Sequence, residues 1–350
     1  MKRILVVRND KIGDFMLAWP SFAMLKRSME CHVTALVPAY TAPLARLCPW
    51  IDEIILDPGS RADKEQQRAL QARIKAAAFD ASICLFSNSR NAMLVWKAHI
   101  PYRLAPATKL AQVLYNQRLI QRRSRSQKPE YEYNLDLVRR FLADQQVSAV
   151  EPQGPYLSFD AESLQQVREQ VAARLRLDAG RPWLMVHAGS GGSANNLSIE
   201  QYARLIIKLN QACPELQCIL TAGPGEEKIA EQLAAELLAH GGNGWIYRSD
   251  EGLPKFCQVM ANAALFVAGS TGPLHIAAAL DVPTIGFFPA HRSATPLRWR
   301  PLNSEGRHLA FSPPEDSDHP EDMSQLDPKT MAAAIARWAP PFWRTEHDTR

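Results

Sequence analysis

The chain has 350 residues, 46% of them hydrophobic and 22% charged, which is the balance of an ordinary globular protein and excludes a disordered or fibrous one. Its N-terminus has only four apolar residues, at 4–7, before a charge, and no window approaches the roughly 20 apolar residues of a membrane-spanning helix. We therefore expect neither a signal peptide nor a transmembrane segment. Six cysteines without C-x-x-C spacing are typical of reduced thiols, so a cytoplasmic location is expected.

Strand and helix patterns alternate along the first half of the chain. A β-branched run at 4–7 leads through a polar loop to a helical period at 15–25. The sequence predicts three further strands, at 32–37, 53–56 and 81–86. It predicts two further helices, at 42–47 and 62–78. Strands that alternate with helices predict a parallel sheet covered by helices.

A second alternating series begins after the Pro- and Gly-bearing stretch 150–155. Strands are expected at 183–187, 217–222, 265–268 and 282–288, and helices at 161–175, 199–211, 226–240, from about 273, and at 329–338. The prediction is an α/β protein of two parallel-sheet domains, residues 1–150 and 151–350.

The segment 268–275, Ala-Gly-Ser-Thr-Gly-Pro-Leu-His, joins a predicted strand to a predicted helix. Ser270 or Thr271 can cap that helix, and Pro273 fits its first turn. The backbone N–H groups of Thr271, Gly272 and Leu274 would then form an anion site at the helix start. An ordinary strand-to-helix connection is an equally good interpretation of these residues alone.

A second loop with hydrogen-bond donors, His187-Ala-Gly-Ser-Gly-Gly-Ser-Ala194, follows the first strand of the second half. It lacks the pattern of a nucleotide-hydrolysing phosphate loop and of a dinucleotide fingerprint, so a plain flexible loop is the rival interpretation. Two such loops after strands of one parallel sheet converge on one edge, where ligands of open α/β sheets bind.

Three single residues are further candidates. Asp14, after the first strand, could project into a cleft between the domains and act as a general base, or could cap the next helix. Glu226 could bind ribose hydroxyls or stabilise a helix start. His275 could reach a phosphate or simply pack. The remaining histidines form no metal-like cluster, so no metal site is expected.

The first half is strongly basic. Residues 1–150 contain 23 Lys and Arg against 13 Asp and Glu, and no acidic residue occurs between Ala81 and Pro129. This stretch contains nine basic residues: Arg90, Lys97, Arg103, Lys109, Arg118, Arg122, Arg123, Arg125 and Lys128. An anionic partner is expected, the alternative being solvated helix faces. No recognised motif supports nucleic acid.

Four segments together resemble glycosyltransferase family 9, the lipopolysaccharide heptosyltransferases. They are residues 8–14, 187–193, 223–227 and 270–280, in order and spacing over nearly the whole chain. The resemblance implies a GT-B fold, with two Rossmann-like parallel-sheet domains and an interdomain cleft. It also implies an inverting, metal-independent transfer of a heptose, typically from ADP-heptose and without a cofactor, to the lipopolysaccharide core oligosaccharide at the inner membrane surface.

The resemblance also implies roles for individual residues. Asp14 is similar to the family's catalytic base, and the first domain would bind the acceptor while the second binds the donor. The expected donor site contains His187, Gly189, Ser190, Asn195, Glu226, Ser270, Thr271, Gly272 and His275. The expected acceptor site contains Lys11, Gly13, Arg118, Arg122, Arg123 and Arg125. In such a fold the C-terminal helix can pack back on the first domain.

Two positions depart from the family pattern, which often has Lys where Asn195 stands and Asp where Ser270 stands. Two alternatives remain open, and only the second of them is suggested by these departures. One is a nucleotide-sugar epimerase of similar architecture, which would need no acceptor. The other is a catalytically weakened protein that binds a sugar nucleotide.

Overall fold

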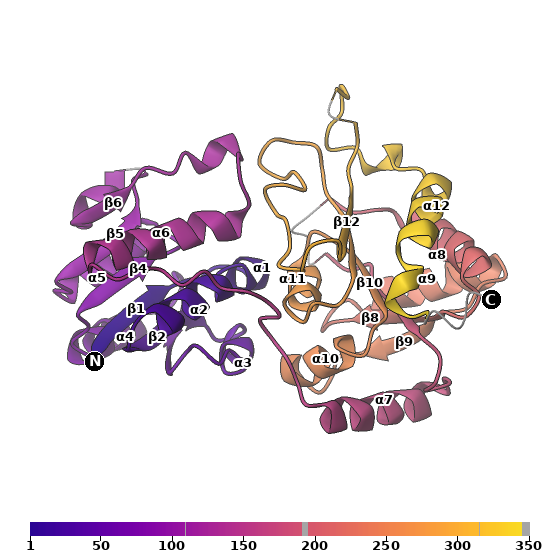
Figure 1. Ribbon diagram of the computed structural model, residues 1–350, viewed down its shortest axis with the longest axis horizontal. Coiled ribbons are helices and arrows are strands. Elements are labelled where there is room, and N and C mark those ends of the chain that lie inside the picture. The colour runs from indigo at the N-terminus through magenta and orange to yellow at the C-terminus, as the bar shows by residue number, and fades with distance from the viewer. Residues whose placement is uncertain (109, 191–194, 315, 345–350) are drawn as a thin grey trace. The chain divides into compact units, whose positions relative to one another are not determined.

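The computed structural model describes residues 1–108, 110–190, 195–314 and 316–344, and it divides into two compact units, Met1–Tyr156 and Leu157–Arg350 (Figure 1). Each unit holds one six-stranded sheet whose neighbouring strands are all parallel. The predicted α/β class with two parallel sheets is therefore confirmed. In the described residues, no helix is both long enough and apolar enough to cross a bilayer.

The sheet of the first unit has the strand order β3-β2-β1-β4-β5-β6. Its strands are β1 (Lys2–Val7), β2 (Cys31–Pro38), β3 (Glu53–Asp57), β4 (Ala81–Cys84), β5 (Tyr102–Pro106) and β6 (Gln117–Leu119). Its helices are α1 (Ile12–Met16), α2 (Trp19–Ser28), α3 (Ala42–Ala45), α4 (Lys64–Ala76), α5 (Ser89–Lys97) and α6 (Glu130–Asp144), with 3₁₀ turns η1 (Leu110–Leu114) and η2 (Arg123–Arg125). The loop after β1 lies at the carboxyl edge of the sheet, with β2 and β4 on either side of the strand.

The sheet of the second unit has the order β12-β11-β10-β7-β8-β9. Its strands are β7 (Trp183–His187), β8 (Gln217–Ala222), β9 (Trp245–Arg248), β10 (Leu265–Gly269), β11 (Thr284–Phe287) and β12 (His308–Phe311). Its helices are α7 (Ala161–Leu175), α8 (Ile199–Ala212), α9 (Glu227–Ala239), α10 (Leu253–Met260), α11 (Gly272–Ala279) and α12 (Pro328–Trp338), with turns η3 (Met323–Gln325) and η4 (Pro340–Phe342). Because β7, β8 and β10 are neighbours, the loops that follow them share one edge.

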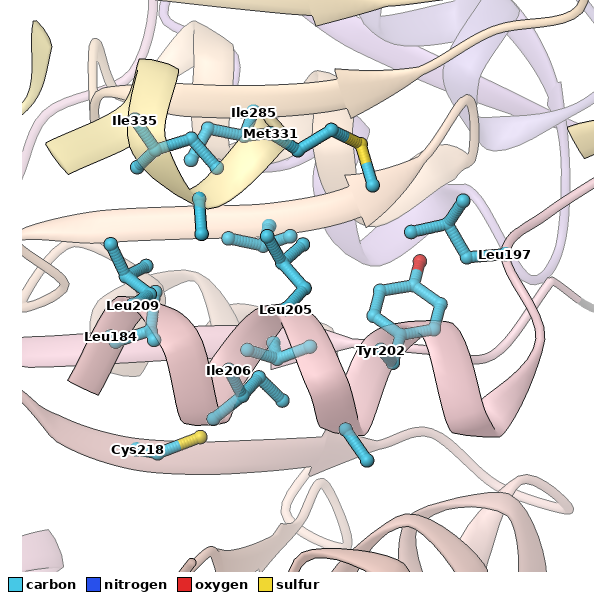
Figure 2. Packing of buried hydrophobic residues seen from close by; sticks show 14 of the residues in the cluster. Leu184, Leu197, Tyr202, Leu205, Ile206, Leu209, Cys218, Ile285, Met331 and Ile335 are labelled. Atoms are coloured by element: carbon cyan, nitrogen blue, oxygen red, sulfur yellow. The ribbon is translucent and has the colours of Figure 1, made fainter. Parts of the chain in front are cut away.

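The core of the second unit forms between the sheet, α8 and the C-terminal helix α12 (Figure 2). Tyr202 and Leu205 of α8 lie against sheet residues, and Met331 and Ile335 of α12 join the same cluster. Helix α8 begins at a capping box in which Ser198 and Gln201 exchange hydrogen bonds, which satisfies two N–H groups at the helix start. The apolar face of α12 is therefore covered by α8 of its own unit.

Most of the predicted elements in the second half have the expected bounds, with α7, β7 and β8 matching at both ends. Two helices of the first half differ from the prediction. The helix expected at 15–25 is divided into α1 and α2, with the break between Leu17 and Ala18, just before Pro20. The helix expected at 42–47 is only the single turn α3. The six cysteines are buried and carry free thiols, as expected.

Candidate active site

A buried arginine at the end of β1 organises the first of two groups of functional side chains. The side chain of Arg8 is only 3% exposed, and it forms ion pairs with Asp14, with Asp10 at 2.9 Å and with Glu130 at 3.4 Å. Its Nη1 also donates to the carbonyl of Leu85, at 3.2 Å. Burial disfavours the charged guanidinium, but the three carboxylates outweigh it and raise the pKa of Arg8 above its ordinary value.

Asp14 lies in the first turn of α1 and bonds to Arg8 rather than to the helix. The N-cap of α1 is Lys11, which makes no side-chain cap, so the alternative of Asp14 as a cap is wrong. Gly13 immediately precedes Asp14, and its carbonyl accepts the N–H of Leu17 at 3.1 Å. Asp14 is therefore held by a fixed cation at the carboxyl edge of the sheet, with 17% of its side chain exposed. A carboxylate in that position can accept a proton from a bound hydroxyl.

Asp10 is a second carboxyl group on the same arginine that the sequence analysis did not single out. Burial raises the pKa of Asp10 from 3.8 to about 7; Arg8 opposes that rise, and the neighbouring Asp14 adds to it. The site thus contains two carboxyl groups in different environments on one cation. Such pairs are common where an enzyme moves protons.

The loop that contains these carboxyls is anchored on both sides. The Asn9 side chain donates to Asp57 at the end of β3 and exchanges two hydrogen bonds with Asn91 of α5, at 2.9 and 2.8 Å. Asp57 in turn forms a bidentate pair with Arg90, at 2.8 and 2.6 Å. The expectation that Arg90 is available to an anionic partner is therefore wrong, because its charge is used inside the unit.

The basic stretch divides into structural and exposed members. Arg123 contacts Glu130 at 2.6 Å, which links it through that carboxylate to Arg8. This contact is structural, and the role of Arg123 in acceptor binding stays a prediction. Arg103 and Lys128 are also used internally, on backbone carbonyls and on Asp136 respectively. The exposed members of the described residues are Lys97, Arg118, Arg122 and Arg125, and none of them forms an ion pair there; Lys109 lies outside these residues.

The second group of side chains lies at the carboxyl edge of the other sheet. His187, the last residue of β7, contacts Thr221 of β8 through Nδ1 at 3.0 Å and Glu226 through Nε2 at 3.2 Å. The Glu226 carboxylate also accepts the N–H of Gly223 at 3.2 Å. Two of the predicted donor-site residues, His187 and Glu226, are thus brought into direct contact.

Small residues let this edge pack tightly. A Cβ added to Gly189 would lie 2.4 Å from the Glu226 carboxylate, so only glycine allows that approach. A Cβ on Gly269 would lie 2.8 Å from Asn196, whose side chain also donates to the carbonyl of Ala188 at 3.0 Å. Asn196 therefore joins the loop after β7 to the end of β10. Ser190, half-buried, follows Gly189, and residues 191–194 of this loop lie outside the described residues.

The start of α11 supplies backbone donors, although fewer than predicted. Thr271 is its N-cap, but the Thr271 hydroxyl and N–H both face the Gly269 carbonyl, at 3.3 and 2.8 Å, and the side chain does not cap the helix. The Thr271 N–H is consequently unavailable to an anion, which corrects that part of the prediction. Gly272 and Leu274 carry the remaining N–H groups of the first turn, which have no acceptor within the helix. This helix start can stabilise negative charge.

His275 is buried one turn into α11. Burial lowers its pKa to about 4, so the imidazole is neutral at physiological pH, and within the described residues its Nδ1 has no hydrogen-bond partner. It could offer a ligand a hydrogen bond but not a positive charge. The N–H of Ser270 is used by the Phe287 carbonyl at 3.2 Å, and exposed Asn195 donates to the Glu321 carbonyl at 3.3 Å.

The functional contacts that sequence reasoning missed are those made by Arg8, Asp10, Glu130, Thr221 and Asn196. Arg8 and Asp10 could have been found from their place directly after the first strand. Glu130 carries no such signal, because it lies 122 residues from its partner Arg8. Among the described residues, no three His, Cys, Asp or Glu side chains are grouped to hold a metal ion.

Comparison with known proteins relates the chain as a whole to one family. The family model described as glycosyltransferase family 9 (heptosyltransferase) matches residues 67–323. A Haemophilus influenzae protein with the provisional name glycosyltransferase is 48% identical over 99% of this chain and 100% of its own. The lipooligosaccharide heptosyltransferase 2 of Haemophilus ducreyi is 23% identical over 80% of this chain and 81% of its own. The solved structure of the Escherichia coli ADP-heptose lipopolysaccharide heptosyltransferase II superposes with a TM-score of 0.75, at 18% identity, over 97% of this chain and 99% of that one.

Proposed function

The chain belongs to glycosyltransferase family 9 and has the GT-B-like fold of that family, and on this basis we propose that it transfers a heptose from ADP-heptose to a lipopolysaccharide core. The glycosyltransferase class follows from family membership, which removes the epimerase alternative. The proposal for the sugar and the acceptor draws on relatives named as heptosyltransferases. The observation that carries the chemistry is the ion pair between Asp14 and the buried Arg8.

In the proposed reaction, Asp14 takes the proton of an acceptor hydroxyl as that oxygen attacks the anomeric carbon of the donor. The new bond joins the acceptor oxygen to this carbon. The bond between the carbon and the diphosphate oxygen breaks, and ADP leaves. Attack opposite the leaving group inverts the configuration at the anomeric carbon. Arg8 fixes the position of Asp14 and does not itself transfer the proton.

The second unit is proposed to bind the donor. Glu226 would accept hydrogen bonds from the ribose hydroxyls, with its carboxylate oriented by His187 and by the Gly223 N–H. The first-turn N–H groups of Gly272 and Leu274 would stabilise charge developing on the departing diphosphate. Asn195 stands where the family often has Lys, so no side-chain cation from that position would stabilise the diphosphate. The backbone N–H groups would therefore supply a larger part of the stabilisation.

The first unit is proposed to bind the acceptor. Arg122 and Arg125 are exposed on either side of Arg123, which is connected through Glu130 and Arg8 to Asp14. Their charges would hold carboxylates or phosphates of the core oligosaccharide close to the base. Lys11, exposed next to α1, could contribute to the same site.

The test of this function is a transfer assay with purified enzyme, ADP-heptose and lipopolysaccharide core that lacks heptose. Mass spectrometry should show the acceptor heavier by one heptose, while UDP- and GDP-sugars should give no product. A thermal-shift series should show stronger stabilisation by ADP than by UDP or GDP, since a ligand that binds only the folded state raises the unfolding temperature. Stabilisation by ADP-heptose without any transfer would instead indicate a sugar-nucleotide binding protein.

A further inference from the structure

Large apolar side chains are exposed in one short segment of the first unit far more often than elsewhere in the protein. Eleven such side chains stand out in the described residues, and five of them lie between residues 93 and 120. They are Met93, Trp96, Leu110, Val113 and Ile120, with exposed fractions of 38, 47, 91, 72 and 75%. Removing so much apolar surface from water would be favourable, so this concentration needs an explanation.

The local structure turns these residues outward. In the 3₁₀ turn η1, Leu110 and Val113 are three residues apart and share a face, while Ala111 and Leu114 pack against the core. Met93 and Trp96 likewise share one face of α5, which contacts η1. They are exposed because the opposite faces of these elements form the core contacts.

These elements lie together at one edge of the sheet. β6 is an edge strand next to β5, and Ile120 directly follows it. Figure 1 shows β5, β6 and α5 gathered at the same end of the first unit. We use the name 93–122 surface for the five apolar residues together with Lys97, Arg118 and Arg122.

The charges on this surface have one sign. Lys97, Arg118 and Arg122 are exposed, form no ion pair within the described part of the chain, and lie in a stretch without any acidic residue from 81 to 129. Exposed aliphatic side chains, a tryptophan and unpaired cations are the combination that binds at a lipid–water interface. The cations would contact anionic headgroups, and the apolar tips would enter the boundary of the acyl chains.

We propose that the 93–122 surface docks the first unit onto an anionic lipid bilayer, with Leu110, Val113 and Ile120 inserted among the lipids. This binding does not depend on which sugar the enzyme transfers, so it can succeed or fail independently of the proposed function. It would place the acceptor-binding unit at the surface where a lipid-linked acceptor is held. Apolar insertion and charge attraction contribute together, because one weak membrane signal gives only marginal binding.

The test is flotation of the full-length protein with two kinds of vesicle, phosphatidylcholine alone and phosphatidylcholine mixed with an equal part of phosphatidylglycerol. The wild type should bind the anionic vesicles and bind the neutral ones much more weakly. Leu110→Ser combined with Val113→Ser should weaken binding at least about tenfold, since two exposed side chains lose their transfer to lipid. Lys97→Glu should weaken binding about fivefold or more, because a charge near the lipid surface contributes about 1 kcal/mol.

Two control variants change exposed side chains outside the 93–122 surface, one in the second unit and one in the first. Leu238→Ser changes a leucine on α9 that is 71% exposed, close to the 72% of Val113, and Arg61→Ser removes an exposed cation far from residue 93 in the sequence. Both should leave vesicle binding unchanged. The unfolding temperature of every variant should match the wild type, because all of these side chains are exposed.

Three results would overturn the proposal. The first is a wild type that does not float with anionic vesicles, and the second is binding that the Leu110 and Val113 changes leave intact. The third is a wild type that does not bind vesicles but self-associates in the ultracentrifuge, with the Leu110 and Val113 changes abolishing that self-association. The surface would then be a protein interface. High salt provides a further check, since it should weaken binding without abolishing the apolar part.

Discussion

The two groups of functional residues are built from opposite kinds of chemistry. In the first unit, three carboxylates surround one buried arginine, so formal charges dominate the site. In the second unit, glycines, backbone N–H groups and a neutral buried His275 dominate, and Glu226 is the main charged group. The difference fits a division of labour in which one unit moves a proton and the other receives negative charge through fixed dipoles.

The largest expected effect in this comparison is on turnover. Asp14→Asn keeps an oxygen for Arg8 but removes the proton acceptor, so kcat should fall by about 10²–10⁴ while ADP affinity stays unchanged. Steady-state transfer and ADP titration measure the two quantities. The control Asp250→Asn changes an exposed aspartate of the second unit and should have no effect on either. Unchanged kcat in Asp14→Asn would remove Asp14 from the mechanism.

The next effect is on stability and belongs to the first unit. Arg8→Met leaves Asp10, Asp14 and the buried Glu130 without their shared cation, which should cost about 3–5 kcal/mol in the free energy of unfolding. Urea unfolding with hydrogen exchange can locate the loss. Arg174→Met removes a surface arginine that pairs with two acidic residues, and it should cost about 1 kcal/mol or less. If Arg8→Met and Arg174→Met lowered the free energy of unfolding equally, the buried ion pairs of Arg8 would contribute no more to stability than a surface ion pair.

A smaller effect should appear in the second unit. Gly189→Ala places a Cβ where the Glu226 carboxylate lies, so that carboxylate must leave His187. We expect ADP to bind about tenfold more weakly, the value of one hydrogen bond to a charged group. Calorimetric titration measures this change. In a protein that already carries Glu226→Ala, the Gly189 change should not weaken ADP binding further. If the two changes instead weakened binding additively, the two residues would act separately.

The exposed cations Arg122 and Arg125 of the first unit should affect acceptor binding and leave donor binding unchanged. Arg122→Glu combined with Arg125→Glu should raise the acceptor KM several-fold and leave the ADP affinity intact, because the two sites lie in different units. Arg123 is left in place, since its loss would disturb Glu130. Steady-state kinetics with the acceptor varied provides the measurement. A change in donor KM of the same size would contradict separate binding sites.

The last effect concerns the dependence of stability on pH. The Asp10 pKa is raised to about 7 in the folded protein from an ordinary value of 3.8, so between these values the folded state holds a proton that the unfolded state has lost. Stability should therefore fall as pH rises from about 4 to about 7, and this part of the fall should vanish in Asp10→Asn. The difference in urea midpoint between the two proteins, measured across that range, tests this. A difference independent of pH would mean that Asp10 titrates normally.

Much of the fold could be predicted from local patterns. The strands β7 and β8 and the helix α7 have the predicted ends because a buried strand or a capped helix leaves a clear signal in neighbouring residues. The sequence did not predict α5, β5, β6 and α6 of the first unit or β9, α10 and β12 of the second. Among these, β6 is a three-residue edge strand with an exposed arginine and no apolar alternation. The place of the loops after β7, β8 and β10 could also be predicted, because they follow strands of one parallel sheet.

By itself the sequence determined two parallel sheets, the loops at their carboxyl edges and the acid-free basic stretch, because each depends on residues close together along the chain. Only the tertiary structure decided which of those charges are available. It brought Glu130 to Arg8 across 122 residues, used Arg90 and Arg123 in internal ion pairs, and turned Leu110 and Val113 outward. Ion pairs and exposed faces depend on which segments meet when the chain folds, and no local pattern encodes that meeting.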